Sequence, residues 1–235
     1  MKGKFKPFIT TASSRTGRHV GRNAGPTKCR TSNAGVTKSF RAFITFSREA
    51  GSGGKLIAQK VAKELGLEFY DEKLLELIAR KAGRRKKVIA KLDEKERGFL
   101  TDLINSLLNP EYLAEQTYIK SLCEVIKALS LKGECLILGR GGNFITSRRN
   151  GLHVRVVTPF WARVNYTMQY EHRSVKNAIS RVRKHDGHRK EFIKQYFDKD
   201  PSNTNYYDLV INTQYLSIDE AVEAVEAAYR EKFKK

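Results

Sequence analysis

A glycine-rich segment, Ser47–Lys55 with the sequence SREAGSGGK, contains the residue types that point most directly to chemistry. It follows the apolar residues 42–46 and precedes residues 56–62, whose apolar spacing is that of a helix. A strand, a glycine-rich turn and a helix in this order present backbone N–H groups that can surround a phosphate. The segment therefore predicts an anion site, with a tight turn that binds no ligand as the alternative. Its residues are Gly51, Ser52, Gly53, Gly54 and Lys55.

The segment does not keep the two catalytic side chains of the standard phosphate-binding pattern G-x-x-x-x-G-K-[ST] at their usual positions. When Gly53 is taken as the second glycine, Gly54 stands at the lysine position and Lys55 at the position of the Mg²⁺-binding hydroxyl. We expect the backbone cradle to be present and these two side chains to be displaced or missing. Lys55 is the candidate to reach the phosphates instead, although its direction around the helix differs by about 100°.

The net charge of +20 is unevenly distributed along the chain. Residues 1–42 contain ten Lys and Arg residues and no Asp or Glu, whereas the remainder contains 35 basic and 25 acidic residues. Clustered basic residues neutralise phosphates, so residues 1–41 are interpreted as an arm that binds nucleic acid. A solubilising tail and an organelle-targeting peptide are the alternatives. The candidate nucleic-acid contacts are Lys2, Lys4, Lys6, Arg15, Arg18, Arg22, Lys28, Arg30, Lys38 and Arg41.

The rest of the composition fits one α/β domain, residues 42–235. Of the 235 residues, 40% are hydrophobic and 30% are charged. No run of about 18 apolar residues suggests a membrane span, and the first residues lack the apolar stretch of a secretory signal. We therefore expect a cytoplasmic protein without a membrane partner, or a mitochondrial one if the arm is a targeting segment.

The cysteines and histidines give no sign of a metal site. The number of cysteines is odd and no C-x-x-C pair occurs, which is typical of reduced thiols in an intracellular protein; they are Cys29, Cys123 and Cys135. Four histidines show no arrangement of ligands or of a catalytic triad and are interpreted as surface or structural residues: His153, His172, His185 and His188.

Predicted strands and helices alternate along the domain. Strands are expected at 42–47, 67–70, 134–138, 153–157 and 208–211. Helices are expected after the glycine segment as far as Gly66, after Asp71 as an N-cap, over much of 84–132, and over 159–198 and 219–233. This alternation predicts a three-layer α/β fold with a parallel sheet. Ligands bind beyond the carboxyl ends of such strands, so the turns that follow the predicted strands should converge on one cleft.

Five motifs, in this order, resemble those of the cytidylate kinase-like family of P-loop proteins, and the resemblance spans roughly residues 42–230. They are Ser47–Lys55, Phe69-Tyr70-Asp71, Gly139-Arg140-Gly141, Arg181-Val182 with Asp186 and Arg189, and Tyr207–Thr213. The resemblance implies a nucleoside-monophosphate-kinase fold with a five-stranded parallel sheet and a helical lid region. The family's own loop usually has glycine at the lysine position and a basic residue next, as Gly54 and Lys55 are here.

The resemblance also implies ATP and Mg²⁺ as cofactors and a pyrimidine nucleoside monophosphate as the acceptor. It assigns nucleotide phosphates to Arg163 and the glycine segment, and acceptor contacts to Asp71 and Arg140. The implied catalytic residues are Lys55, Arg181, Asp186 and Arg189. No residue is assigned as a direct metal ligand. The alternatives are an N-cap for Asp71, an internal salt bridge for Arg140 and a solvated helix face for the arginines of the lid region.

Some residues depart from the cytidylate kinase pattern. Gly141 stands where those enzymes have an acidic residue, and Leu77 and Ile78 occupy the stretch where they have an arginine. Two hypotheses therefore remain open. The first is an ATP-dependent kinase. The second is a weakly active or inactive kinase-like protein that binds RNA, a ribosome or another ribonucleoprotein particle through its basic arm.

Overall fold

The computed structural model describes residues 41–90 and 116–234. The predicted arm lies outside these residues except for Arg41, which lies 3.8 Å from Glu134 in an ion pair. Cys29 also lies outside them, whereas Cys123 and Cys135 are free, buried thiols. Within the described residues, no helix has both the length and the apolar character needed to cross a membrane.

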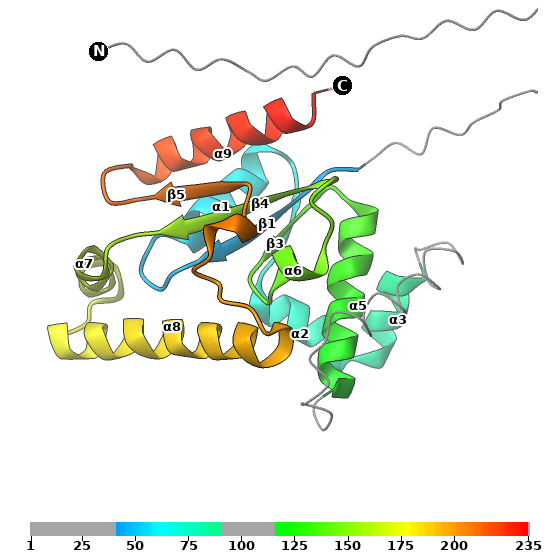
Figure 1. The fold of residues 1–235 in the computed structure, drawn as a ribbon, viewed down its shortest axis with the longest axis horizontal. Helices are drawn as coiled ribbons and strands as arrows, with labels where there is room; N and C mark the ends of the chain where they lie inside the picture. Colours follow the sequence, from blue (N-terminus) through cyan, green and yellow to red (C-terminus); the bar gives the residue numbers. More distant parts are fainter. Residues whose placement is uncertain (1–40, 91–115, 235) are drawn as a thin grey trace, which may run out of the picture. The chain divides into compact units, whose positions relative to one another are not determined.

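In the described residues, one sheet contains five parallel strands in the order β2-β3-β1-β4-β5 (Figure 1). This confirms the predicted parallel sheet. The central strand β1 pairs with β3 on one side and β4 on the other, so Ile44 lies opposite both Leu136 and Leu152. The strands are β1 (Phe43–Arg48), β2 (Glu68–Tyr70), β3 (Cys135–Leu138), β4 (Gly151–Val157) and β5 (Leu209–Asn212).

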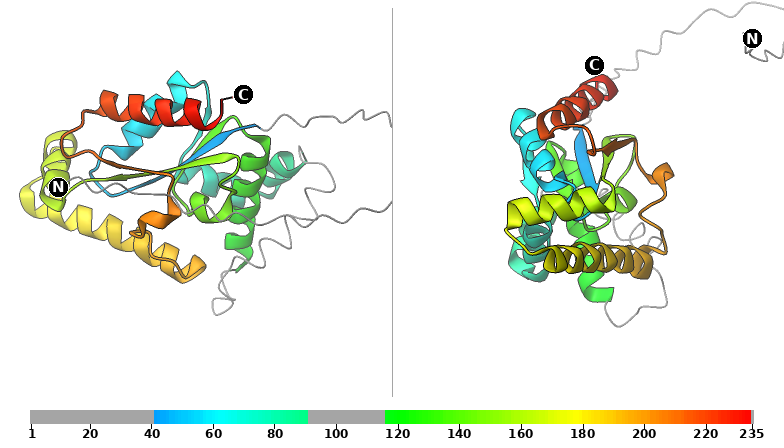
Figure 2. Two further views of the ribbon diagram at one scale, coloured as in Figure 1. Left: turned by 45° about the horizontal axis from the view of Figure 1, so that its top comes forward. Right: turned by 90° about the vertical axis from the view of Figure 1, so that its left-hand side faces the viewer.

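Helices cover both faces of the sheet. On one face lie α1 (Gly54–Glu64) and α9 (Ile218–Lys232), and on the other α2 (Glu72–Arg80), α3 (Ala82–Ile89), α5 (Gln116–Lys132) and α6 (Gly142–Ile145). The predicted lid region forms α7 (Phe160–Glu171) and α8 (Val175–Phe197), followed by the short 3₁₀ helix η2 (Thr204–Tyr206). All views place α8 on the side of the sheet opposite α9 (Figures 1 and 2).

The alternation of side chains along β1 divides the apolar residues into two cores. Ile44 and Phe46 face α1 and α9, whereas Phe43 faces α2 and α5, as expected for a strand buried on both faces. The second core also receives Ile193 and Phe197, so the carboxyl end of α8 is anchored in the domain. These two cores and the sheet make up the predicted three-layer fold.

Candidate functional site

The glycine loop joins β1 to α1 at the carboxyl edge of the sheet. Gly51 and Gly53 have φ values of +75° and +74°, which glycine adopts without strain. No side chain caps α1, and the first N–H groups of an α-helix lack partners within the helix. The hydroxyl of Ser52 donates to the carbonyl of Glu49 at 2.9 Å, and that of Thr213 donates to the carbonyl of Ser52 at 3.0 Å. These two hydrogen bonds therefore hold the loop in place, while the amides at the start of α1 are left for an anion.

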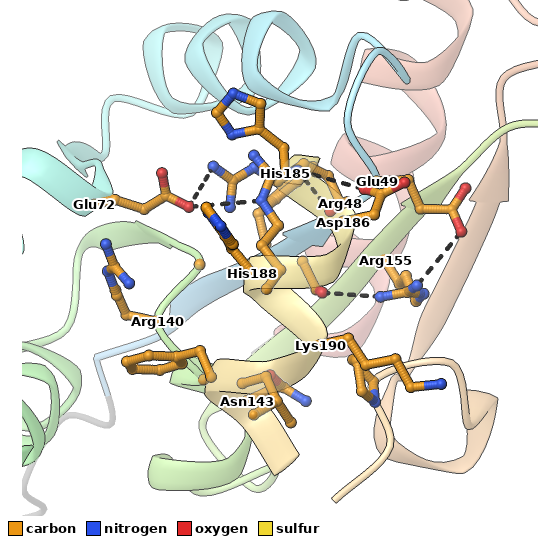
Figure 3. Close-up of a pocket in the computed structure, with 18 of the residues that line it drawn as sticks. Arg48, Glu49, Glu72, Arg140, Asn143, Arg155, His185, Asp186, His188 and Lys190 are labelled. Carbon is orange, nitrogen blue, oxygen red and sulfur yellow. Dashed lines mark hydrogen bonds and ion pairs between the residues drawn. The ribbon is translucent and has the colours of Figure 1, made fainter. Parts of the chain in front are cut away.

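Two cavities meet beside this loop. The glycine-loop cavity has a volume of about 400 Å³ and lies between residues 50–56 and the facing parts of α7 and α8. The α2–α8 cavity has a volume of about 590 Å³ and is lined by α2, the turn after β3, and α8. Figure 3 shows α8 presenting His185, Asp186, His188 and Lys190 along one side of the site. The residues common to both cavity walls are Arg48, Glu49, Glu72, His185 and Arg189.

Arg48, Glu72 and Arg189 form a cluster of charges where the two cavities meet. A carboxylate oxygen of Glu72 lies 2.7 Å from Arg48 (Figure 3) and 3.9 Å from Arg189. Burial would raise the pKa of Glu72, but the guanidinium of Arg48 and then that of Arg189 hold it below its usual value. Burial, followed by the charge of Arg48, lowers the pKa of Arg189 to about 10, so this residue is still cationic at neutral pH. Two cations thus share one carboxylate at this point.

Arg163 and Asp186 connect both lid helices to the glycine loop. Asp186 forms an ion pair with Arg163 and accepts a hydrogen bond of 2.8 Å from the amide of Ala50. The buried Arg163 donates to the carbonyls of Thr158 at 2.8 Å and of Ala50 at 3.1 Å. These bonds fix the position of the loop relative to α8.

Lys55 and Arg181, two of the predicted catalytic residues, line the glycine-loop cavity. The Nζ atom of Lys55 lies 3.2 Å from Asp71, and its side chain is 54% exposed. Arg181 forms an ion pair with Glu171 and lies 2.8 Å from the ring of His185. Both cations are therefore held by neighbours at the rim of this cavity.

Asp71 and Arg140, the predicted acceptor contacts, lie in different surroundings. Asp71 accepts a hydrogen bond of 3.0 Å from the amide of Leu74, so it is the N-cap of α2. Among the described residues, the walls of the two cavities include its neighbour Glu72 but not Asp71. Arg140 lines the α2–α8 cavity, where it pairs with Glu76 and lies 5.0 Å above the ring of Phe192.

The comparisons with known proteins agree with this geometry. The model of the cytidylate kinase-like family matches residues 43–215. The chain belongs to this family. Its fold is that of the P-loop kinases, and a structure of an uncharacterised protein from Eubacterium ventriosum has it too: 21% identity, a TM-score of 0.65, and coverage of 81% of this chain and 99% of that one.

Two further structures are less similar to this member of the cytidylate kinase-like family. A Thermus thermophilus protein is 18% identical, with a TM-score of 0.47 and coverage of 83% of this chain and 99% of that one. Shikimate kinase from Acinetobacter baumannii is 17% identical, with a TM-score of 0.43 and coverage of 83% and 96%. The search of curated proteins gives no significant match.

Several residues of this cytidylate kinase-like site received no role from the sequence. Arg155 lies 3.1 Å from the hydroxyl of Ser47 and 3.6 Å from Glu49, with its guanidinium over the ring of Tyr207. Its signal is a charged residue within the mostly apolar strand β4. His185 and His188, interpreted as surface or structural residues, line the α2–α8 cavity. Their sequence context, isolated histidines on a basic helix, gave no comparable indication of a functional role.

The site residues fit the phosphates of a nucleotide better than a free metal ion. The described residues contain no group of three or more His, Cys, Asp or Glu side chains that could hold a metal. Glu72 and Asp186 are paired with arginines, and Glu49 lies 3.4 Å from Arg163. Mg²⁺ is commonly bound by one or two carboxylates together with substrate phosphates and water, so this family member needs no preformed cage for it.

Proposed function

We propose that this protein transfers a phosphoryl group from ATP to a pyrimidine nucleoside monophosphate. The observation that carries the proposal is the junction of the two cavities at Arg48, Glu72 and Arg189. One cavity offers helix amides for the donor's phosphates, and the other has room for an acceptor. A group that passes from one ligand to the other crosses this charged junction.

The donor would bind with its phosphates in the glycine-loop cavity. The amides at the start of α1 and the positive end of the helix dipole favour an anion there. Arg163 and Asp186 would act by fixing the loop, and Lys55 and Arg181 would add positive charge at the rim. Mg²⁺ bound with the nucleotide would neutralise charge on its phosphates.

The acceptor would bind in the α2–α8 cavity, whose volume of about 590 Å³ is that of a small-molecule site. Arg140 and Arg155 offer charge to a phosphate or a polar base edge. The rings of Phe144, Phe192 and Tyr207 offer apolar surface to a planar base. This combination of charge and aromatic surface suits a nucleotide better than a purely apolar ligand.

The proposed reaction needs positioning and charge rather than a covalent intermediate. A phosphate oxygen of the acceptor attacks the terminal phosphorus of ATP and forms a new P–O bond. The bond from that phosphorus to the bridging oxygen breaks, and its electron pair leaves with ADP. Arg189 at the junction would stabilise the charge on the transferring oxygens.

The experiment is a transfer assay with ATP, Mg²⁺ and a panel of CMP, UMP, dCMP and AMP. We expect transfer to CMP, UMP or dCMP, and a loss of roughly 1,000-fold or more in the double variant Arg181→Ala/Arg189→Ala. No transfer to any acceptor would contradict the proposal. If the double variant transfers phosphate as fast as the wild type, the roles proposed for these two arginines are wrong.

A second proposal concerns RNA and rests on the charge of the arm. Ten basic residues and no acidic residue occur in residues 1–42, and such a segment can pair with successive phosphates. This proposal is compatible with the first, because an RNA-bound protein can also bind a nucleotide. Measurement of RNA affinity against salt, described in the Discussion, tests it separately.

A further inference from the structure

Gly54 lacks a side chain because Arg48 occupies the space that one would need. A Cβ atom at Gly54 would lie 2.6 Å from Cβ of Arg48 and 3.1 Å from its Cγ. Gly54 is the first residue of α1 and is not among the glycines with positive φ, so its backbone conformation does not require glycine. The glycine at the lysine position of the loop is therefore a packing requirement set by Arg48.

The side chain of Arg48 passes from the end of β1 to the junction of the two cavities. It is buried, and its guanidinium lies 2.7 Å from Glu72. A second glycine, Gly139 in the turn after β3, leaves room for this guanidinium, since a Cβ there would lie 2.6 Å from its Nη1 atom. Glycines from two separate turns thus border one arginine, at its stem and at its charged end.

We propose that Arg48 is the cation that acts on the transferring phosphoryl group, in place of the lysine that the standard loop has at the position of Gly54. The inference rests on the proposed function, which it deepens by naming a further catalytic residue. Arg48 lines both cavities, as a residue that contacts a group in transit must. Its planar guanidinium can donate two parallel hydrogen bonds to phosphate oxygens.

The charges around Arg48 favour an anion at the junction. Arg189 donates a hydrogen bond of 3.4 Å to the carbonyl of Arg48, and both guanidinium groups face Glu72, while Arg189 also lies 3.9 Å from Asp186. Besides burial, the charge of Arg48 lowers the pKa of Arg189, so the two guanidinium groups lie close enough to repel each other. An anionic phosphoryl group bound between them would relieve this repulsion.

Lys55 is less suited to this role. It is the next residue along the helix, so its side chain points about 100° away from that of Gly54. The structure directs it to Asp71, at 3.2 Å, with more than half of its side chain exposed. Lys55 therefore lies at the rim of the glycine-loop cavity, whereas Arg48 lies at the junction.

The first test compares Arg48→Met/Glu72→Gln with Glu72→Gln alone, so that neither variant leaves a carboxylate unpaired in the protein interior. Arg85→Met is the matched control, because Arg85 pairs with Glu124 at 3.8 Å and lines neither cavity among the described residues. The readouts are MgATP affinity by calorimetry, the transfer rate and the thermal unfolding midpoint. We expect the double variant to transfer roughly 100-fold more slowly than Glu72→Gln, and the control to match the wild type.

The second test asks whether a lysine can replace Arg48. Gly54→Lys alone should weaken MgATP binding, because its side chain collides with Arg48. Arg48→Gly/Gly54→Lys removes the collision and places a lysine at its standard position in the loop, so it should bind MgATP and transfer phosphate at least 10-fold better than Arg48→Gly. A purely structural role for Arg48 predicts no such gain.

The outcomes separate this inference from the proposed function. If the wild type transfers phosphate and Arg48→Met/Glu72→Gln is as active as Glu72→Gln, Arg48 has no catalytic role while the proposed function stands. If Gly54→Lys fails to rescue Arg48→Gly although the double variant is folded, the inference is also overturned. If the wild type neither binds MgATP nor transfers phosphate, the proposed function and the inference both fail.

Discussion

Asp186 binds Arg163 and the amide of Ala50 at the same time, so one carboxylate on α8 holds both α7 and the glycine loop. Replacing it by asparagine keeps an acceptor for the amide but removes one of the two carboxylates that pair with the buried guanidinium of Arg163; the other is Glu49, at 3.4 Å. We predict that Asp186→Asn lowers the free energy of unfolding by roughly 1–3 kcal/mol, measured by urea denaturation.

The control for this prediction is Asp198→Asn, at the C-cap position of α8. Asp198 pairs with Lys194, but both side chains are about two-thirds exposed. Exposed pairs contribute little, so this variant should unfold at the same urea concentration as the wild type. Equal effects of the two variants would show that the bonds of Asp186 have no special importance for stability.

Asp71 offers a way to separate helix capping from acceptor binding. Asp71→Ala removes the N-cap of α2 and should cost about 1 kcal/mol of unfolding free energy, whereas Asp71→Asn keeps a capping oxygen and should cost much less. Both variants remove the charge beside Lys55. If the carboxylate binds the acceptor, both should raise the acceptor KM in the transfer assay. An unchanged KM in Asp71→Asn would leave capping as its only role.

His153 should make the protein sensitive to acid. Its side chain is fully buried and lies 2.6 Å from the hydroxyl of Thr45, and burial lowers its pKa from 6.5 to about 4. The folded state therefore binds fewer protons than the unfolded state between these values. The neutral, buried His153 therefore contributes to the free energy of unfolding in full above about pH 6.5. This contribution is lost as the pH falls towards 4, by up to about 3 kcal/mol.

The measurement is the unfolding free energy of wild type and His153→Phe from pH 7.5 to pH 4.5. The variant cannot bind the proton, so its curve should be flatter than that of the wild type in this window. Both proteins contain the same Asp and Glu residues, so the contributions of these carboxylates cancel when the two curves are subtracted. Parallel curves would mean that His153 titrates normally in the folded state.

The basic arm can be tested without reference to catalysis. Removal of residues 1–41 takes away ten basic residues and should weaken the binding of a single-stranded RNA oligonucleotide. The slope of log affinity against log salt should also fall, by about 0.7 for each RNA phosphate that the arm no longer neutralises. A full-length variant with the ten residues changed to Gln is the control for chain length. An unaltered slope in both variants would exclude RNA binding by the arm.

Much of the fold was predictable because its signals are local. The five strands and the longer helices of the described residues lie close to the predicted positions, and Asp71 caps α2 as expected, but the short helices α6 and η2 were not predicted. The glycine loop was also recognisable from its spacing. The prediction of Asp71 as an acceptor contact shows where local signals are not enough. The side chain of Asp71 turns back to cap its own helix, and the next residue, Glu72, lines the cavities instead.

The partners of the charged residues could not be read from the sequence. Arg48 meets Glu72 across the carboxyl edge of the sheet, and Arg163 meets Asp186 from another helix. These pairs depend on how β1, α2, α7 and α8 pack, and no spacing along the chain encodes that. The same holds for Arg48 and Gly54, whose close approach becomes visible only once the strand and the helix are in place.

The 23-residue helix α8 borders both cavities, with Arg181 at one of them, His185 and Arg189 at both, and Phe192 at the other. A rigid helix cannot adjust one of these side chains by moving its backbone without displacing the rest. A ligand that binds in one cavity and shifts α8 therefore changes the affinity of the other cavity for its own ligand. By thermodynamic reciprocity the effect is equal in both directions, so the two substrates should bind cooperatively rather than independently.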